Sequence, residues 1–186
     1  MQRSARRTPL PNRVRIIGGE WRSRVIAFPN LPGLRPTPDR VRETLFNWLG
    51  QRLDGQRCLD LFAGSGALGF EAASRGAAEV VMVERDARVL SRLREQATRL
   101  RADRVRIVAA DGLEYLATDC GRFDLILLDP PFGSGLLAPA LARAATRLAA
   151  GGRIYAEFGD RPDLTGWRVL REGHAGLSHY CLLEPI

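Results

Sequence analysis

The chain has 186 residues, of which 45% are hydrophobic and 26% are charged, and its formal net charge is +7. This predicts one globular domain with a real core and at most a small appendage. No apolar run approaches the roughly 20 residues of a membrane span. Arginines near the start have no apolar stretch behind them, which argues against a secretory signal. Three separated cysteines and two histidines argue against a metal site, and we expect a cytoplasmic protein.

The positive charge is concentrated in the first quarter of the chain. All 28 basic residues are arginine, and ten of them lie in residues 1–44 beside only three acids. Residues 45–186 hold 18 arginines and 18 acids. One interpretation is a solubilising tail. The other is a nucleic-acid contact, because guanidinium groups bind phosphate oxygens in pairs.

The first elements read as an extension of the main domain. We expect residues 1–12 to form a disordered basic arm. Residues 13–19 and 22–28 alternate basic and apolar side chains, which predicts two short strands with an arginine-rich face. Together with the following helix they would make a basic extension over residues 13–50, the part of the chain that would face a nucleic acid, ahead of the main domain at 51–186.

A helix is predicted to open near residue 37 and to run to about residue 49. Thr37 is a good N-cap, Pro38 suits the first turn, and Asp39 favours the positive helix end. Its apolar residues fall on one face. The helix should therefore pack against the main domain.

Strand and helix patterns alternate from residue 56. The predicted strands cover residues 57–63, 78–84, 104–110, 123–129 and 152–158, and the predicted helices 67–75, 86–100, about 111–117 and 135–149. Two closing strands, 166–173 and 177–185, form a hairpin. The pattern predicts an α/β, Rossmann-like fold. It would have a mostly parallel seven-stranded sheet, an antiparallel C-terminal hairpin and helices on both faces.

A glycine loop follows the first strand of this sheet. The stretch GSGALG is a full G-x-G-x-x-G that begins at Gly64, and Glu84 lies 20 residues beyond, where an acid can reach ribose hydroxyls. The pattern is compatible with binding of a dinucleotide or of S-adenosylmethionine, and it can also form only a tight structural turn. Asp60 favours S-adenosylmethionine, because a carboxylate there would repel a pyrophosphate and attract sulfonium and amino groups. It could also simply brace the loop.

Further acids end the next strands at the same edge. Asp111 follows the third strand and either caps a helix or accepts a hydrogen bond from an adenine amine. Because ligands bind at the carboxyl ends of parallel strands, we expect these acids and the glycine loop to surround one cofactor.

The stretch DPPF at residues 129–132 ends the fourth strand. Two prolines hold the turn extended and leave carbonyl oxygens as the main-chain groups they offer. Asp129 and the Pro130 carbonyl can accept both hydrogens of an exocyclic amine, and Phe132 can stack on its ring. The alternative is a rigid turn with Phe132 in the core.

With these residues in view, the chain resembles a known family. DPPF matches the D/N-P-P-Y/F signature of amino-methyltransferases. The stretches RIIGGEWRSRVIAFPNLPGLRPTPDRVRETLFNWL and LDLFAGSGALGFEAASRGA resemble bacterial 16S rRNA guanine-N2 methyltransferases of the RsmD type. The resemblance implies methyl transfer from S-adenosylmethionine to a guanine that Asp129, Pro130 and Phe132 hold outside its stack. It implies cofactor contacts by Asp60, Phe62, Gly64, Gly66, Glu84, Asp111 and Gly112.

The resemblance also implies 16S rRNA or the small ribosomal subunit as partner, and we expect a monomer without metal. The candidate RNA contacts are Arg22, Arg24, Arg35, Arg40 and Arg42. Arg35 and Arg40 could instead brace the active-site rim. Rival functions are an adenine-N6 or protein-glutamine methyltransferase, an NAD-dependent oxidoreductase, and a non-catalytic rRNA-binding protein.

Overall fold

A computed structural model describes residues 12–118 and 121–186. The predicted disordered arm falls almost entirely on residues 1–11, outside the described part of the chain. In the part that is described, no helix is both long and apolar enough to cross a membrane.

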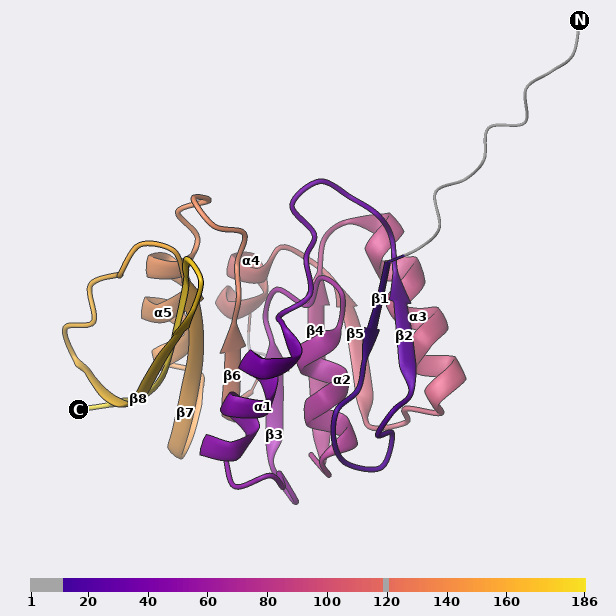
Figure 1. Ribbon diagram of the computed structural model, residues 1–186. Coiled ribbons are helices and arrows are strands. Elements are labelled where there is room, and N and C mark those ends of the chain that lie inside the picture. The colour runs from indigo at the N-terminus through magenta and orange to yellow at the C-terminus, as the bar shows by residue number, and fades with distance from the viewer. Residues whose placement is uncertain (1–11, 119–120) are drawn as a thin grey trace, which may run out of the picture.

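A seven-stranded sheet forms the centre of the molecule (Figure 1), with the strand order β5-β4-β3-β6-β7-β9-β8. The five strands from β3 to β7 are parallel, whereas β9 is antiparallel to both β7 and β8. The predicted fold and its antiparallel C-terminal hairpin are therefore confirmed. The strands are β3 Arg57–Asp60, β4 Glu79–Glu84, β5 Val105–Ala109, β6 Phe123–Leu128, β7 Leu148–Phe158, β8 Trp167–Ala175 and β9 Ser178–Pro185.

Helices cover both faces of this sheet. Buried side chains of α1, α2 and α3 join the core on one face, and those of α4 and α5 join the core on the other. Helices α1, α3 and α5 bury one apolar face each, whereas every residue of α2 is buried, including the polar Glu71 and Ser74. The helices are α1 Asp39–Trp48, α2 Ala67–Ser74, α3 Ala87–Leu100, α4 Gly112–Ala117 and α5 Leu137–Ala145.

The predicted N-terminal strands form a separate two-stranded antiparallel sheet, β1 Asn12–Arg15 and β2 Val25–Phe28. Val14 and Phe28 are buried and belong to the same core as Phe70 of α2. The hairpin and α1 therefore share one hydrophobic core with the sheet. A division of the chain at residue 50 stays a prediction.

The end of the predicted helix at 135–149 is wrong. Helix α5 ends at Ala145, and Leu148 already belongs to β7, where it pairs with Phe123. Both side chains are buried in the sheet. Pairing with the neighbouring strand thus overrides helical propensity here, and the register then shifts before Leu125 pairs with Arg153.

Candidate active site

Three adjacent strands bring acidic residues to one rim. Asp60 ends β3, Glu84 ends the neighbouring β4, and Asp129 directly follows β6 on the other side of β3. Because these strands are parallel, their carboxyl ends share one edge of the sheet, as the sequence predicted.

The glycine loop wraps round two of these acids. The N–H of Gly64 donates to Glu84 Oε2 at 3.0 Å, and the N–H of Gly69, in the first turn of α2, donates to Asp60 Oδ2 at 2.9 Å. Gly66 has a φ of +80° immediately before α2, a left-handed conformation that glycine adopts without a Cβ clash. A Cβ at Gly69 would lie 2.9 Å from Asp60 Oδ2. The loop therefore brings main chain against a buried carboxylate, which explains its glycines.

The electrostatics of the rim favour a cationic guest. Burial, together with the charges of Asp129 and Glu84, raises the pKa of Asp60 to about 7. Burial likewise raises the pKa of Asp129 to about 6. A positively charged ligand would stabilise both carboxylates, whereas a pyrophosphate would add repulsion.

On the far side of β4, Asp111 caps α4 by accepting hydrogen bonds from the N–H groups of Leu113 at 2.9 Å and Glu114 at 3.4 Å. Its Oδ2 lies 3.5 Å from the Arg85 guanidinium. The capping interpretation is therefore confirmed, and a contact with an adenine amine stays a prediction.

The residue after Asp111 is packed against the strand end of β3. A Cβ at Gly112 would lie 3.0 Å from the Leu61 carbonyl oxygen and 3.1 Å from the Phe62 ring. Phe62 and Gly112 are thus neighbours on the rim, as expected if both line one cofactor site.

In the DPPF turn, Pro130 is buried, whereas Phe132 is 54% exposed. Phe132 is therefore no core residue, and that alternative is wrong. Its ring lies beside Gly159, where a Cβ would be 3.8 Å away, in the loop after β7. An exposed ring at the rim is available for stacking on a planar base.

Comparisons with known proteins identify this arrangement. Residues 14–184 match the family described as Conserved hypothetical protein 95. The chain belongs to this family. Ribosomal RNA small subunit methyltransferase D of Escherichia coli strain K12 is 41% identical over 177 residues, which cover 92% of this chain and 89% of the relative. The protein of the same name from Haemophilus influenzae is 39% identical over 180 residues, covering 92% and 93%.

Solved structures agree with the sequence matches. The Escherichia coli protein yhhF superposes with a TM-score of 0.85 at 41% identity, covering 94% of this chain and 98% of that one. Thermus thermophilus protein TTHA0928 gives a TM-score of 0.76 at 32% identity, covering 92% and 99%. The RsmD-type resemblance and the methyltransferase fold are confirmed.

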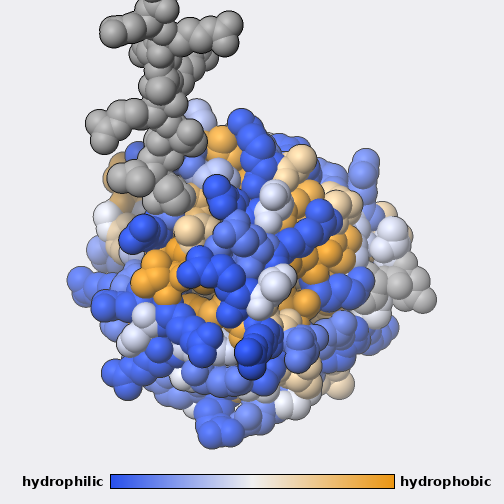
Figure 2. All heavy atoms as spheres, turned by 90° about the vertical axis from the view of Figure 1, so that its right-hand side faces the viewer, coloured by the Kyte–Doolittle hydropathy of each residue, from blue (hydrophilic) through white to orange (hydrophobic). Residues whose placement is uncertain are grey.

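The predicted RNA contacts divide into three groups. Arg35 and Arg40 are exposed on either side of Thr37, close to the rim. Arg22 and Arg24 are exposed in and after the turn between β1 and β2. That turn bonds to Ser74 at the C-terminal end of α2, whereas the glycine loop lies at the opposite end of this helix. Figure 2 looks onto the side with this hairpin and α3, where hydrophilic side chains dominate.

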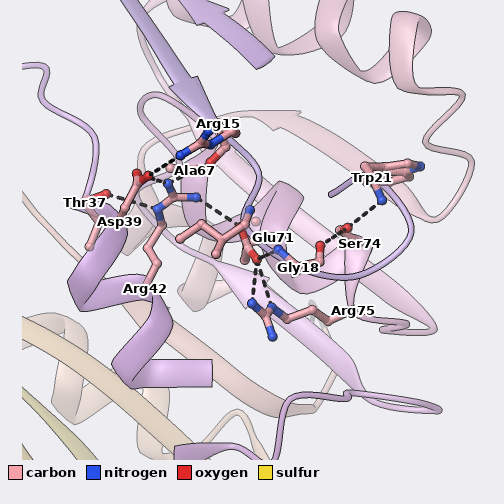
Figure 3. A network of polar contacts seen from close by, with 12 residues as sticks. Arg15, Gly18, Trp21, Thr37, Asp39, Arg42, Ala67, Glu71, Ser74 and Arg75 are labelled. Carbon is pink, nitrogen blue, oxygen red and sulfur yellow. Dashed lines mark hydrogen bonds and ion pairs between the residues drawn. The ribbon is translucent and has the colours of Figure 1, made fainter. Parts of the chain in front are cut away.

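The prediction that Arg42 contacts RNA is wrong. Its side chain is fully buried, and it pairs with Glu71 at 3.1 Å and with Asp39 at 2.6 Å (Figure 3). A guanidinium without exposed surface cannot reach a phosphate of a bound RNA. Buried arginines are rare and almost always paired, so the reading from charge alone assigned it to the surface.

Thr37 was expected to cap α1, and this is wrong. The N-cap position is Pro38, without a side-chain capping bond, and the Thr37 hydroxyl donates to Asp129 Oδ2 at 3.2 Å.

Sequence reasoning also missed Glu157, a buried acid near the carboxyl end of β7. Burial and the charge of Asp129 raise its pKa to about 8. Reading the last residues of β7 as part of the rim would have found it.

Proposed function

We propose that this protein transfers a methyl group from S-adenosylmethionine to the exocyclic N2 amine of a guanine in small-subunit ribosomal RNA. Support comes from membership of a family that includes Ribosomal RNA small subunit methyltransferase D of two species. The observation that carries the proposal is the convergence of Asp60 and Asp129, whose charges interact across adjacent strand ends. A monomer acting in the cytoplasm, as the sequence predicts, is part of the same proposal.

The cofactor site is proposed from the fit between its residues and S-adenosylmethionine. Asp60 is buried and faces the charges of Asp129 and Glu84, so a sulfonium and an ammonium group would offset their repulsion. The Gly64 N–H orients Glu84, which leaves this acid placed for ribose hydroxyls. When bound, the cofactor would supply an electrophilic methyl group.

The substrate site is proposed at the DPPF turn. Asp129 accepts a hydrogen bond from the guanine amine, the Pro130 carbonyl accepts a second, and the exposed Phe132 ring stacks on the base. The two acceptors hold the amine hydrogens away from the ring plane, which frees the nitrogen lone pair for the methyl group. Asp129 is also placed to receive the proton that the methylated nitrogen loses.

Among the rival functions, an NAD-dependent oxidoreductase rests on the glycine pattern alone and conflicts with the buried Asp60. Adenine and glutamine amines would suit the same cradle, so the choice of ribosomal RNA rests on the relatives named Ribosomal RNA small subunit methyltransferase D. Intact rim residues likewise disfavour a purely binding protein.

The test uses small ribosomal subunits that lack the modification, naked small-subunit rRNA, and labelled S-adenosylmethionine, followed by mapping of the labelled nucleoside. We expect label on guanine N2. Asp129→Ala should reduce turnover by about a hundredfold or more, while S-adenosylmethionine affinity stays near that of the wild type. Asp163→Ala, an exposed acid outside the rim, is the matched control. Wild-type turnover by Asp129→Ala would eliminate the cradle, and label on another nucleoside would eliminate the guanine assignment.

A further inference from the structure

The hydroxyl of Thr37 reaches the acid of the DPPF turn from a distant part of the chain. Its Oγ1 donates to Asp129 Oδ2 at 3.2 Å, although the two residues are 92 positions apart. Thr37 itself is only 5% exposed, so this contact is shielded from solvent. The segment before α1 therefore touches the group that we propose binds the substrate amine.

This contact divides the two oxygens of Asp129 between different tasks. Oδ2 is occupied by the Thr37 hydroxyl, which leaves Oδ1 for a donor on the substrate. The hydrogen bond also lowers the pKa of Asp129, in opposition to burial, which raises it. Thr37 thus favours the ionised form of Asp129, in which both oxygens act only as acceptors.

Asp129 faces further titratable groups, namely Asp60 on β3 and Tyr155 and Glu157 on β7. Glu157 accepts from the Tyr155 hydroxyl at 2.8 Å and from the Ser178 hydroxyl at 3.3 Å. Thr37 lowers the pKa of Glu157 as well as that of Asp129, so its hydroxyl lies near both carboxylates. The hydrogen bond itself runs from Thr37 Oγ1 to Asp129 Oδ2, at 3.2 Å.

Thr37 is held in place by Arg42. The Nε of Arg42 donates to the Thr37 carbonyl oxygen at 3.2 Å, and one terminal nitrogen donates to the Arg15 carbonyl oxygen at 2.8 Å. Pro36 and Pro38 on either side restrict the backbone further. Figure 3 shows Arg42 with Thr37 and Asp39 on one side and Glu71 on the other. The main chain at Thr37 therefore has little freedom to move away from Asp129.

Glu71 anchors this arrangement to the cofactor side of the molecule. It lies in the helix that follows the glycine loop, and it bonds to Arg42 at 3.1 Å and to Arg75 at 2.9 Å. It also accepts from the N–H groups of Ile17 at 2.9 Å and Gly18 at 2.8 Å. One buried acid thus joins the N-terminal extension, α1 and α2.

We propose that Thr37 is a positioning residue of the methyl transfer reaction, whose hydroxyl fixes Oδ2 of Asp129 so that Oδ1 receives the substrate amine. Arg42 and Glu71 hold Thr37 in register. This role rests on the proposed function, and it makes the N-terminal extension a structural part of the active site in addition to any contact with RNA.

The experiment compares Thr37→Val, which removes the hydroxyl at nearly constant volume, with Thr37→Ser, which keeps it. Both are assayed on small subunits over a range of pH, and S-adenosylmethionine affinity and thermal midpoint are measured in parallel. For Thr37→Val we expect kcat to fall by about tenfold or more, with cofactor affinity within about twofold of wild type. The acid limb of its pH–rate profile should move to higher pH, because Asp129 loses the donor that lowers its pKa. Thr37→Ser should restore both.

Two outcomes would overturn the positioning role. One is a Thr37→Val enzyme with the kcat and acid limb of the wild type. The other is a Thr37→Ser enzyme as impaired as Thr37→Val, which would show that the hydroxyl is not the active group. A wild type that labels no guanine amine would instead overturn the proposed function, so the two failures are distinguishable.

Discussion

Replacing Glu71 by glutamine tests the buried network that joins the N-terminal extension to α2. The wild-type carboxylate has no exposed side-chain surface and faces the guanidinium groups of Arg42 and Arg75, of which at most 5% is exposed. It also accepts two main-chain N–H bonds. The glutamine side chain would keep the shape but remove the negative charge between two buried cations.

The expected loss of unfolding free energy depends on the partners that Arg42 and Arg75 keep. Removing one partner of a buried ion pair costs about 3–5 kcal/mol, because the other charge is left without compensation. Arg42 keeps Asp39 at 2.6 Å, so we expect the lower end, about 3 kcal/mol. That is a large part of a typical stability of about 5–15 kcal/mol.

Urea unfolding of the ligand-free protein measures this change. With a slope of about 2 kcal/mol per molar urea, the midpoint should fall by about 1.5 M. Glu95→Gln is the matched control, because Glu95 pairs with Arg92 at 2.6 Å with both side chains 46% exposed. Such a surface pair is worth about 0.5 kcal/mol. If Glu71→Gln and Glu95→Gln lost the same small unfolding free energy, the network would not stabilise the fold.

Two further predictions concern ligands. Because S-adenosylmethionine should bind the ionised form of Asp60, whose pKa is about 7, its affinity should be about tenfold weaker at pH 5.5 than at pH 7. Asp60→Asn should bind weakly with a flatter pH dependence, as titration calorimetry would show; equal wild-type affinities at both pH values would contradict the role of Asp60. Replacing Arg22 and Arg24 by Ala should weaken RNA binding and reduce the slope of log K against log salt by about one per lost phosphate contact. The Arg35 and Arg40 double variant gives the comparison at the rim, and an unchanged slope for Arg22 and Arg24 would assign them to solubility.

The site could be predicted where it depends on strand ends. Asp60, Glu84 and Asp129 each end or follow a parallel strand, so their common rim follows from the alternation of strands and helices. The alternation of strands and helices did not reveal which single side chains are buried and which are exposed. Phe132 could have been a core residue or a stacking surface, and only its 54% exposure excluded the core.

The sequence by itself determined the α/β architecture, the glycine loop and three acids of the rim, Asp60, Glu84 and Asp129, because hydrophobic periodicity and turn residues act over short stretches of chain. Only the tertiary structure decided that Arg42 is buried against Glu71, and that Thr37 binds Asp129 instead of capping its own helix. These contacts join residues 29 and 92 positions apart. The partner of a single charged or hydroxyl side chain does not follow from any periodic pattern in the sequence. Such long-range pairs form only when the whole core packs.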